Sequence, residues 1–160
     1  MSKPIFIVAI LFISSTLTLS VHRPSFSAET CTPLVAVGGE PGQTIVQKTV
    51  SAPSIPVGIA SLKRDNWNTD FAVDSNVKYK RFVATLIPES SGTYSIKMYL
   101  KYNQGTADEV YNNKPNLSSG KSLTMSGNSR NNEQPYQINL FVGDAESIAK
   151  SYSISVKGCR

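Results

Sequence analysis

The stretch Gly92-Thr-Tyr-Ser-Ile-Lys-Met-Tyr-Leu-Lys-Tyr102 alternates apolar and polar side chains with a period of two residues. One face of this alternation holds Tyr94, Ile96, Met98, Leu100 and Tyr102, and the other holds Ser95, Lys97, Tyr99 and Lys101. A period of two is typical of a β-strand that has one face on a core and the other in water. Residues 92–102 are therefore predicted to be a strand of an antiparallel sheet.

Similar strand patterns recur along the chain, and helical patterns hardly appear. The longer candidates are 77–88, 136–142 and 148–156, and the shorter ones are 34–37, 44–50, 55–62 and 67–73. In 77–88 the apolar residues change phase, which predicts a bulge near Lys80-Arg81. The turn residues 89–92 predict a hairpin between the strands on either side. Eight or nine strands joined by short turns favour an all-β fold, an antiparallel β-sandwich.

The only two cysteines, Cys31 and Cys159, lie near the two ends of the predicted domain. A disulfide between them would close a loop of 129 residues (159 − 31 + 1), for which the chain-entropy relation gives about 5 kcal/mol of stabilisation. We expect this bond, with the N- and C-terminal strands adjacent. A reactive pair and an intermolecular link are the alternatives, and the absence of a C-x-x-C spacing argues against redox chemistry.

Residues 1–28 have the layout of a signal peptide, with Lys3 ahead of the apolar run 5–13 and no acidic residue. We expect cleavage near 27–28, which leaves 29–160 as a single sandwich domain that is secreted or periplasmic. The alternative is an uncleaved membrane anchor, because 4–21 forms a mostly apolar span of 18 residues. After cleavage we expect no membrane association.

Composition narrows the function of the exported chain. Removing Lys3 and Arg23 leaves 14 basic residues (16 − 2) against 11 acidic ones, a net charge of +3, and the basic residues are scattered, so we expect no nucleic-acid partner. His22 is the only histidine and lies in the leader. Without an imidazole, histidine-dependent nucleophilic catalysis and histidine-ligated zinc are excluded. We therefore expect a protein that is not an enzyme.

The segment 65–74 concentrates side-chain oxygens and amides around the only tryptophan. Trp67 could stack on a sugar ring while its polar neighbours bond hydroxyl groups, although a core tryptophan is the commoner case. The candidate ligand-binding residues are Asp65, Asn66, Trp67, Asn68 and Asp70, together with Tyr99 on the wet face of 92–102. Calcium is the one candidate cofactor, with Asp65, Asn68, Asp70 and Asp74 as its ligands, although turns use the same residues.

Residues 103–135 are rich in asparagine and are predicted to form a long irregular loop, either functional or merely mobile. The chain resembles, in its architecture alone, small exported sandwich domains that bind carbohydrate or protein. We therefore predict a non-catalytic domain that binds an extracellular or periplasmic partner, carbohydrate or calcium among them, through loops 65–74 and 103–135. The alternative is a structural or assembly component of the cell envelope that associates with an envelope protein through an edge strand.

Overall fold

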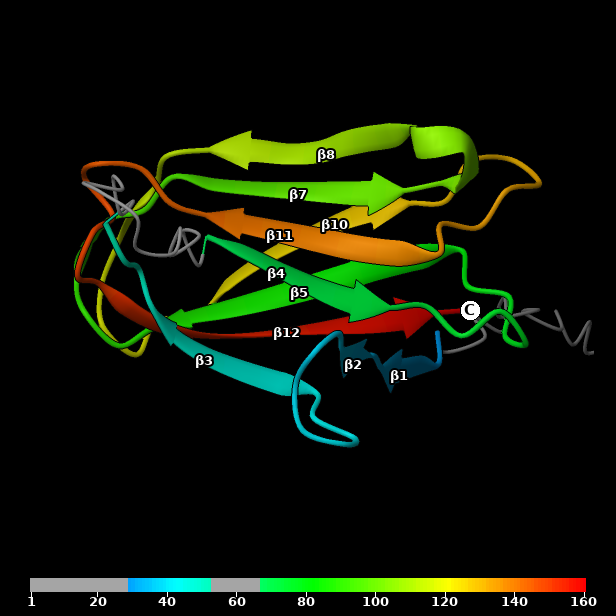
Figure 1. Ribbon diagram of the computed structural model, residues 1–160, viewed down its shortest axis with the longest axis horizontal. Coiled ribbons are helices and arrows are strands. Elements are labelled where there is room, and N and C mark those ends of the chain that lie inside the picture. The colour runs from blue at the N-terminus through cyan, green and yellow to red at the C-terminus, as the bar shows by residue number, and fades with distance from the viewer. Residues whose placement is uncertain (1–28, 53–66) are drawn as a thin grey trace, which may run out of the picture.

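The computed structural model describes residues 29–52 and 67–160. The described chain forms two five-stranded antiparallel sheets, which pack as two layers whose strands cross in Figure 1. Sheet A consists of β1 (Cys31–Pro33), β3 (Ile45–Thr49), β5 (Arg81–Pro88), β10 (Leu123–Asn128) and β12 (Ser151–Cys159). Sheet B consists of β2 (Val35–Ala36), β4 (Asn68–Ala72), β7 (Ile96–Lys101), β8 (Ala107–Asn113) and β11 (Gln137–Val142). The predicted antiparallel β-sandwich is confirmed.

The order of strands shows how the chain crosses between the layers. Sheet A runs β1-β12-β5-β10, with β3 also paired to β12, and sheet B runs β2-β4-β11-β7-β8. A small ladder joins β6 (Gly92–Thr93) to β9 (Asn116–Leu117). Eight of the described strands have five residues or more, in agreement with the predicted number, and the other four are shorter.

The core lies between the two sheets and is built from the predicted alternation. All five apolar residues of the 92–102 pattern are fully buried, whereas Lys97, Tyr99 and Lys101 keep part of their surface in water. Strands β5 and β12 contribute the facing layer with Phe82, Ala84, Leu86, Ile154 and Val156. Burying apolar surface from both sheets is the main source of stability in such a sandwich.

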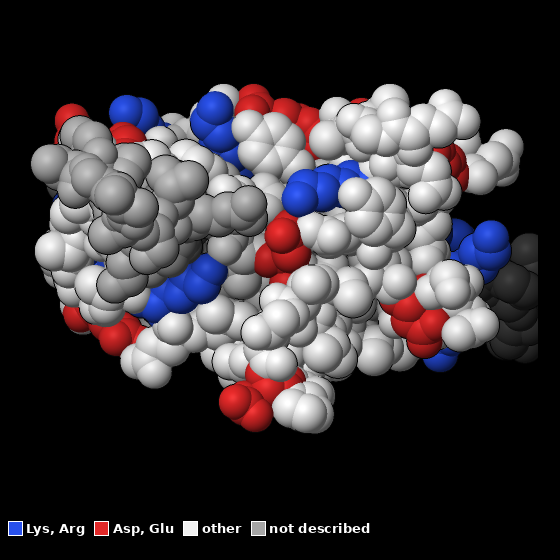
Figure 2. All heavy atoms as spheres, in the orientation of Figure 1, with Lys and Arg blue, Asp and Glu red and all other residues white. Residues whose placement is uncertain are grey.

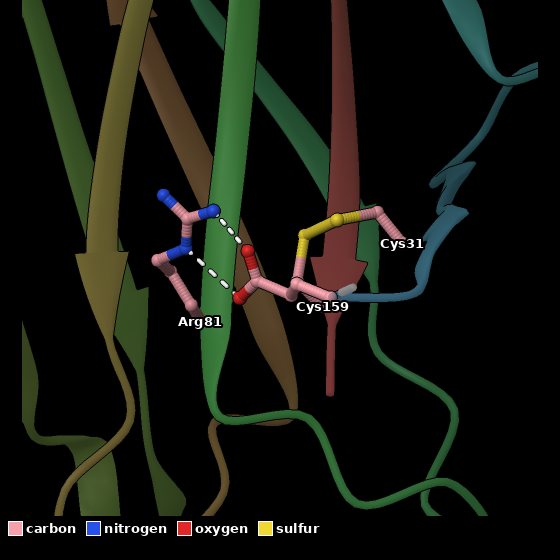
Figure 3. The surroundings of a disulfide bond; sticks show 4 residues. Cys31, Arg81 and Cys159 are labelled. Atoms are coloured by element: carbon pink, nitrogen blue, oxygen red, sulfur yellow. Dashed lines mark hydrogen bonds and ion pairs between the residues drawn. A yellow bond between two sulfur atoms is a disulfide. The ribbon is translucent and has the colours of Figure 1, made fainter. Parts of the chain in front are cut away.

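The first and last strands are fastened at one end of the sandwich. β1 pairs with β12 so that Cys31 lies opposite Cys159, and their sulfur atoms form a disulfide with a Cα–Cα distance of 4.1 Å. Figure 3 shows Arg81 beside this bond, and its Nε donates to Glu29 Oε1 at 3.0 Å. The disulfide and the ion pair thus tie the N-terminal segment to β12 and β5. The predicted bond and the adjacency of the terminal strands are confirmed.

Three local predictions are wrong. The turn at 89–92 does not close a hairpin, because β5 belongs to sheet A and β7 to sheet B, and the chain between them crosses from one layer to the other. The change of phase in 77–88 falls where β5 begins at Arg81, so it needs no bulge within a strand. The last strand begins at Ser151, because residues 144–149 form turns.

Residues 103–135 are not an irregular loop. They form a 3-10 turn at Asn103–Gly105, then the edge strand β8, the short strand β9 and the edge strand β10, which are separated by loops. β8 pairs with β7, and β10 pairs with β5. Polar residues are tolerated because edge strands expose much of their surface, and this explains why the asparagine content is misleading.

Two earlier expectations fall on parts of the chain that the structure does not describe. The signal peptide at 1–28 lies outside the described residues, as does the whole of the candidate strand 55–62. Among the residues that are described, no helix is long and apolar enough to cross a membrane.

Candidate functional site

The outer face of sheet B brings together polar and aromatic side chains from four strands. We call the following residues the sheet B face: Asn68, Asp70, Lys97, Tyr99, Lys101, Glu109, Gln137, Asn139 and Phe141. On β4, β7 and β11 they occupy the positions between the core residues, so they point away from the core, and Glu109 on the edge strand β8 is exposed. In Figure 2, seen with sheet B in front, basic and acidic side chains lie beside each other over the middle of this face.

Strand register sets four of these residues in a row across the sheet. Asn139 on β11 lies opposite Asp70 on β4 and, on its other side, opposite Tyr99 on β7. Tyr99 in turn lies opposite Glu109 on β8. Neighbouring strands are about 4.8 Å apart. The row Asp70-Asn139-Tyr99-Glu109 therefore sets a carboxylate, an amide, an aromatic ring and a second carboxylate at regular spacing, with the amide of Asn139 buried at 4% exposure.

Asp70 is the centre of a hydrogen-bonded cluster at one end of the row. Its Oδ1 accepts from Asn139 Nδ2 at 2.8 Å and from Lys101 Nζ at 3.1 Å. Asn139 Nδ2 also donates to Asn68 Oδ1 at 3.1 Å. Partial burial alone would raise the pKa of Asp70, but the hydrogen bonds from Asn139 and Lys101 outweigh it and hold the pKa below its usual value. Asp70 is consequently a fixed, ionised acceptor at neutral pH.

Tyr99 is held in a similar way at the other end. Its hydroxyl donates to Glu109 Oε2 at 2.7 Å, and this bond to the carboxylate raises the pKa of Tyr99 to about 12. Glu109 also accepts from Asn112 Nδ2 at 2.8 Å and lies 3.9 Å from Lys97 Nζ. The bonds from Tyr99 and Asn112 lower the pKa of Glu109. The phenol ring is therefore positioned on the sheet with its hydroxyl engaged.

Trp67 supports the sheet B face from its margin. Its indole ring meets Phe141 edge to face, with centroids 5.7 Å apart, and its Nε1 donates to the carbonyl oxygen of Ser51 at 2.7 Å. Gly143 packs so closely that an added Cβ would lie 2.2 Å from the indole. These contacts on several sides fix the ring in a half-buried position and give it a clear role in packing.

A hollow adjoins the face beside β4. It has a volume of about 320 Å³ and is lined by the β2–β3 connection, by Lys48 on β3 and by Asn68 and Asp70. Lys48 Nζ donates to the carbonyl oxygen of Asn68 at 2.6 Å. Burial lowers the pKa of Lys48, and the negative charge of Asp70 partly offsets this. Asn68 and Asp70 thus border both the hollow and the sheet B face.

The structure brings only part of the predicted site together. Asn68, Asp70 and Tyr99 lie on the sheet B face, whereas Asp65 and Asn66 fall outside the described residues. The segment 65–74 is not simply a loop, because Asn68–Ala72 forms β4, as the strand candidate 67–73 predicted. Sequence reasoning missed Asn139 and Glu109, which come from other strands. Only the alternation of apolar and polar residues in 136–142 pointed to Asn139, because it assigns this residue to the side of the strand that faces away from the core.

The calcium site stays a prediction. Asp74 lies in the turn after β4, where its Oδ1 accepts from the backbone N–H of Asn76 at 2.8 Å, and Asp70 already faces the ammonium of Lys101. Within residues 29–52 and 67–160, one cluster of three acidic or sulfur groups has ligand-like spacing, namely Glu29 with Cys31 and Cys159. The two sulfur atoms of that cluster are bonded to each other, so they do not offer thiolates.

Comparison with known proteins gives distant structural likenesses. No family model and no curated protein matches the sequence. The fold is similar to a mutant family 29 carbohydrate-binding module in complex with mannohexaose, at a TM-score of 0.45 and 13% identity, over 83% of this chain and 93% of that one. It is also similar to a family 29 carbohydrate-binding module at a TM-score of 0.43 and 14% identity, over 83% and 90% of the two chains. These likenesses are too distant to assign a ligand to the present chain.

Proposed function

We propose that this protein is an exported, non-catalytic domain that binds carbohydrate through the sheet B face. The observation that carries the proposal is the row Asp70-Asn139-Tyr99-Glu109. A sugar presents hydroxyl groups that both donate and accept hydrogen bonds, and its ring presents C–H groups that pack on an aromatic ring. The row offers ionised acceptors at both ends and a phenol ring between them. The amide of Asn139 donates to Asn68 and Asp70, so it positions Asp70 for the ligand.

Preorganisation favours binding by this face. The side chains of the row are already held by hydrogen bonds to one another, so less rotamer freedom is lost when a ligand arrives. Lys97 and Lys101 flank Tyr99 on the same strand and add donors on both sides of the ring. An open sheet face of this kind suits a stretch of a polysaccharide chain better than a small, enclosed molecule.

The protonation of the face supports a binding role over catalysis. Glycoside hydrolysis uses a pair of carboxyl groups, one of which is kept protonated by a raised pKa. The pKa values of Asp70 and Glu109 are both lowered by hydrogen-bond donors, so both groups are ionised at neutral pH. A face with two ionised carboxylates lacks the proton donor that the reaction needs.

The test is binding to neutral soluble polysaccharides, measured by calorimetry and by affinity electrophoresis on a panel of β-linked glucans and mannans. Tyr99→Ala should weaken binding by about tenfold, because it removes the only ring in the row. Tyr136→Ala is the matched control, since Tyr136 is half exposed but lies before β11 and outside the row. Equal losses in both variants, or no binding to any member of the panel, would refute this function.

Calcium belongs to the same experiment. If residues 65–74 hold the ion, the melting temperature should rise with calcium concentration and fall with EDTA, as expected for a ligand that binds only the folded state. Asp74→Asn should abolish the rise, whereas Asp144→Asn, placed in another turn, should leave it intact. An unchanged melting temperature with calcium and with EDTA would exclude the predicted ligands.

Export rests on the disulfide. Such bonds persist in oxidising compartments and are rare in the cytosol, so the Cys31–Cys159 bond fits a protein that folds outside the cell or in the periplasm. N-terminal sequencing of the exported protein should give a first residue at 28 or 29. An intact leader on membrane-bound material would favour the anchor instead.

Assembly through an edge strand is the second candidate function. Among the described strands β3 pairs only with β12. Ile45 on β3 is 62% exposed, more than any other large hydrophobic residue in the described part of the chain. An exposed apolar residue on an edge is a common site of strand addition. Light scattering after gel filtration should then show oligomers that grow with concentration and are lost in Ile45→Lys. A monomer at every concentration would dismiss this candidate.

A further inference from the structure

A hollow at the end of the sandwich lies away from the row on the sheet B face. It has a volume of about 610 Å³ and is lined by residues 78–80 and 128–134. Figure 1 shows the two loops involved, before β5 and before β11, at the same end as the C-terminus. We call this hollow the end cavity. Its volume is within the range of about 300–1,000 Å³ that ligand pockets occupy.

The walls of the end cavity are fixed by hydrogen bonds between its two loops. Gln134 Oε1 accepts from the backbone N–H of Tyr79 at 2.8 Å, and Ser129 Oγ donates to the carbonyl oxygen of Tyr79 at 3.0 Å. The backbone N–H of Lys80 donates to the carbonyl oxygen of Cys159 at 2.8 Å, next to the disulfide. The two loops are thereby tied to each other and to the last strand.

Arg130 is committed to the wall and is not available to a ligand. Its Nη2 and Nε donate to the two carboxylate oxygens of Asp108 at 2.7 and 2.9 Å, and its guanidinium carbon lies 4.0 Å from the centre of the Tyr102 ring. Nη1 also donates to Glu133 at 3.2 Å. A bidentate pair with a stacked ring is a rigid arrangement, so Arg130 braces the loop 129–134.

Other polar groups of the lining remain unengaged. No hydrogen bond or ion pair joins the ammonium of Lys78 or Lys80 to any other described residue, and the side-chain amides of Asn128, Asn131 and Asn132 likewise have no partner among the described residues. All five side chains are exposed to solvent. The lining as a whole carries three positive charges and one negative charge, and the negative one, Glu133, pairs with Arg130.

We propose that the end cavity is a second binding site, for a saccharide that carries carboxylate groups. Lys78 and Lys80 pair with the carboxylates, and Asn128, Asn131 and Asn132 bond the hydroxyl groups of the sugar rings. Ammonium groups bind anionic oxygens with charge-assisted hydrogen bonds, whereas amides both donate and accept, as hydroxyl recognition requires. A phosphate or sulfate ion alone would use the two ammonium groups and leave the three amides without a purpose.

The site differs in chemistry from the sheet B face. On that face each lysine described above is matched by a carboxylate, and an aromatic ring is central. In the end cavity two lysines are unmatched, and the nearest ring, Tyr79, is 94% buried (6% exposed) and so offers little stacking surface. The end cavity should therefore select saccharides that carry negative charge, whereas the sheet B face should bind uncharged saccharides.

The experiment measures binding of trigalacturonate to the full mature domain by calorimetry, with a neutral cello-oligosaccharide of equal length as the comparison. Lys78→Gln with Lys80→Gln should weaken trigalacturonate binding about tenfold or more and leave the melting temperature unchanged, because both side chains are exposed. Lys121→Gln with Lys157→Gln is the matched control, since it removes the same charge from exposed lysines outside the cavity. It should leave binding unchanged.

Two further variants separate the possible failures. Asn131→Ala should weaken trigalacturonate binding but not binding of sulfate, and Tyr99→Ala should affect neither. Equal losses in the two lysine pairs would show a general electrostatic attraction and overturn the proposal. Sulfate that competes as strongly as trigalacturonate at matched ionic strength would reduce the cavity to an anion site and overturn it as well. Binding of neutral polysaccharides to the Tyr99→Ala variant tests the sheet B face independently of the end cavity.

Discussion

Replacing both Cys31 and Cys159 with alanine should destabilise the domain mainly through its unfolded state. The bond closes a loop of 129 residues (159 − 31 + 1), and the chain-entropy relation for that length gives about 5 kcal/mol. The native pairing should survive, because backbone hydrogen bonds between Thr30 and Arg160, at 3.1 and 3.3 Å, flank the pair of cysteines and do not need the sulfur atoms. Domains of this size have a total stability of about 5–15 kcal/mol. The loss is therefore a large part of the whole.

Urea unfolding of the oxidised protein and of the double variant measures the effect. The free energy of unfolding should fall by about 5 kcal/mol. The dependence of that free energy on urea should become steeper, because an unfolded chain without the link expands and exposes more surface. Reduction of the unmodified protein should give the same two changes and serves as the control. A loss below about 1 kcal/mol with an unchanged slope would refute the argument, since a link that spans nearly the whole domain would then not restrict the unfolded chain.

Three smaller perturbations test packing, charge and a buried hydroxyl. Gly143→Ala places a Cβ 2.2 Å from the indole of Trp67, so the ring must move. We expect a red shift of tryptophan fluorescence and a decrease of about 1–3 kcal/mol in the free energy of unfolding measured with urea. An unshifted spectrum would contradict the close packing of Gly143 on the indole. The folded pKa of Asp70 lies below its usual 3.8, so the ionised carboxylate stabilises the fold at pH values above its unfolded pKa, and this stabilisation is lost as the pH falls through the folded pKa. Asp70→Asn should therefore make the free energy of unfolding fall less steeply at acidic pH. An identical fall in both proteins would count against the hydrogen-bonded cluster around Asp70. Tyr94→Phe removes a hydroxyl that donates to the carbonyl oxygens of Ser90 and Ser151 at 2.6 and 3.0 Å. The substitution should lower the free energy of unfolding, measured with heat or urea, by about 1–3 kcal/mol. An unchanged free energy would mean that the two carbonyl oxygens find other donors.

The orientation of side chains in the long strands was predictable because it is a local property. In 92–102 the period of two assigns each residue to the core or to water without any knowledge of the partner strands, and all five predicted core residues are buried. The pairing of the cysteines was predictable for a different reason. With only two cysteines there is one intramolecular bond to make, and their places near the ends of the domain bring its terminal strands together.

Strand pairing could not be predicted in the same way. The turn 89–92 has the residues of a hairpin, yet β5 and β7 lie in different sheets, because the buried side chains of β7 belong to the layer that faces β5. The edge strand β8 was hidden by its asparagines. Which strands pair depends on contacts between residues far apart in the chain, and local turn chemistry does not report them.

The candidate site shows the same limit. Asp70 and Tyr99 stood out in the sequence, but Asn139 and Glu109 become their neighbours only through the register of β4, β11, β7 and β8. The residues of the row are spread over 70 positions (139 − 70 + 1), so no motif spacing joins them. The asparagines at 128, 131 and 132 were noticed as a composition bias, and the folded loops convert that bias into the lining of a cavity.

For this protein the amino-acid sequence alone determined the class of fold, the core face of its clearest strand and the covalent link between its ends. These follow from short-range alternation and from the count of cysteines, which need no tertiary information. The choice of partner for each strand, and with it the row on the sheet B face and the end cavity, was decided only by the tertiary structure. Register and layer depend on how the apolar faces of all the strands are buried together, and that is a property of the whole folded chain.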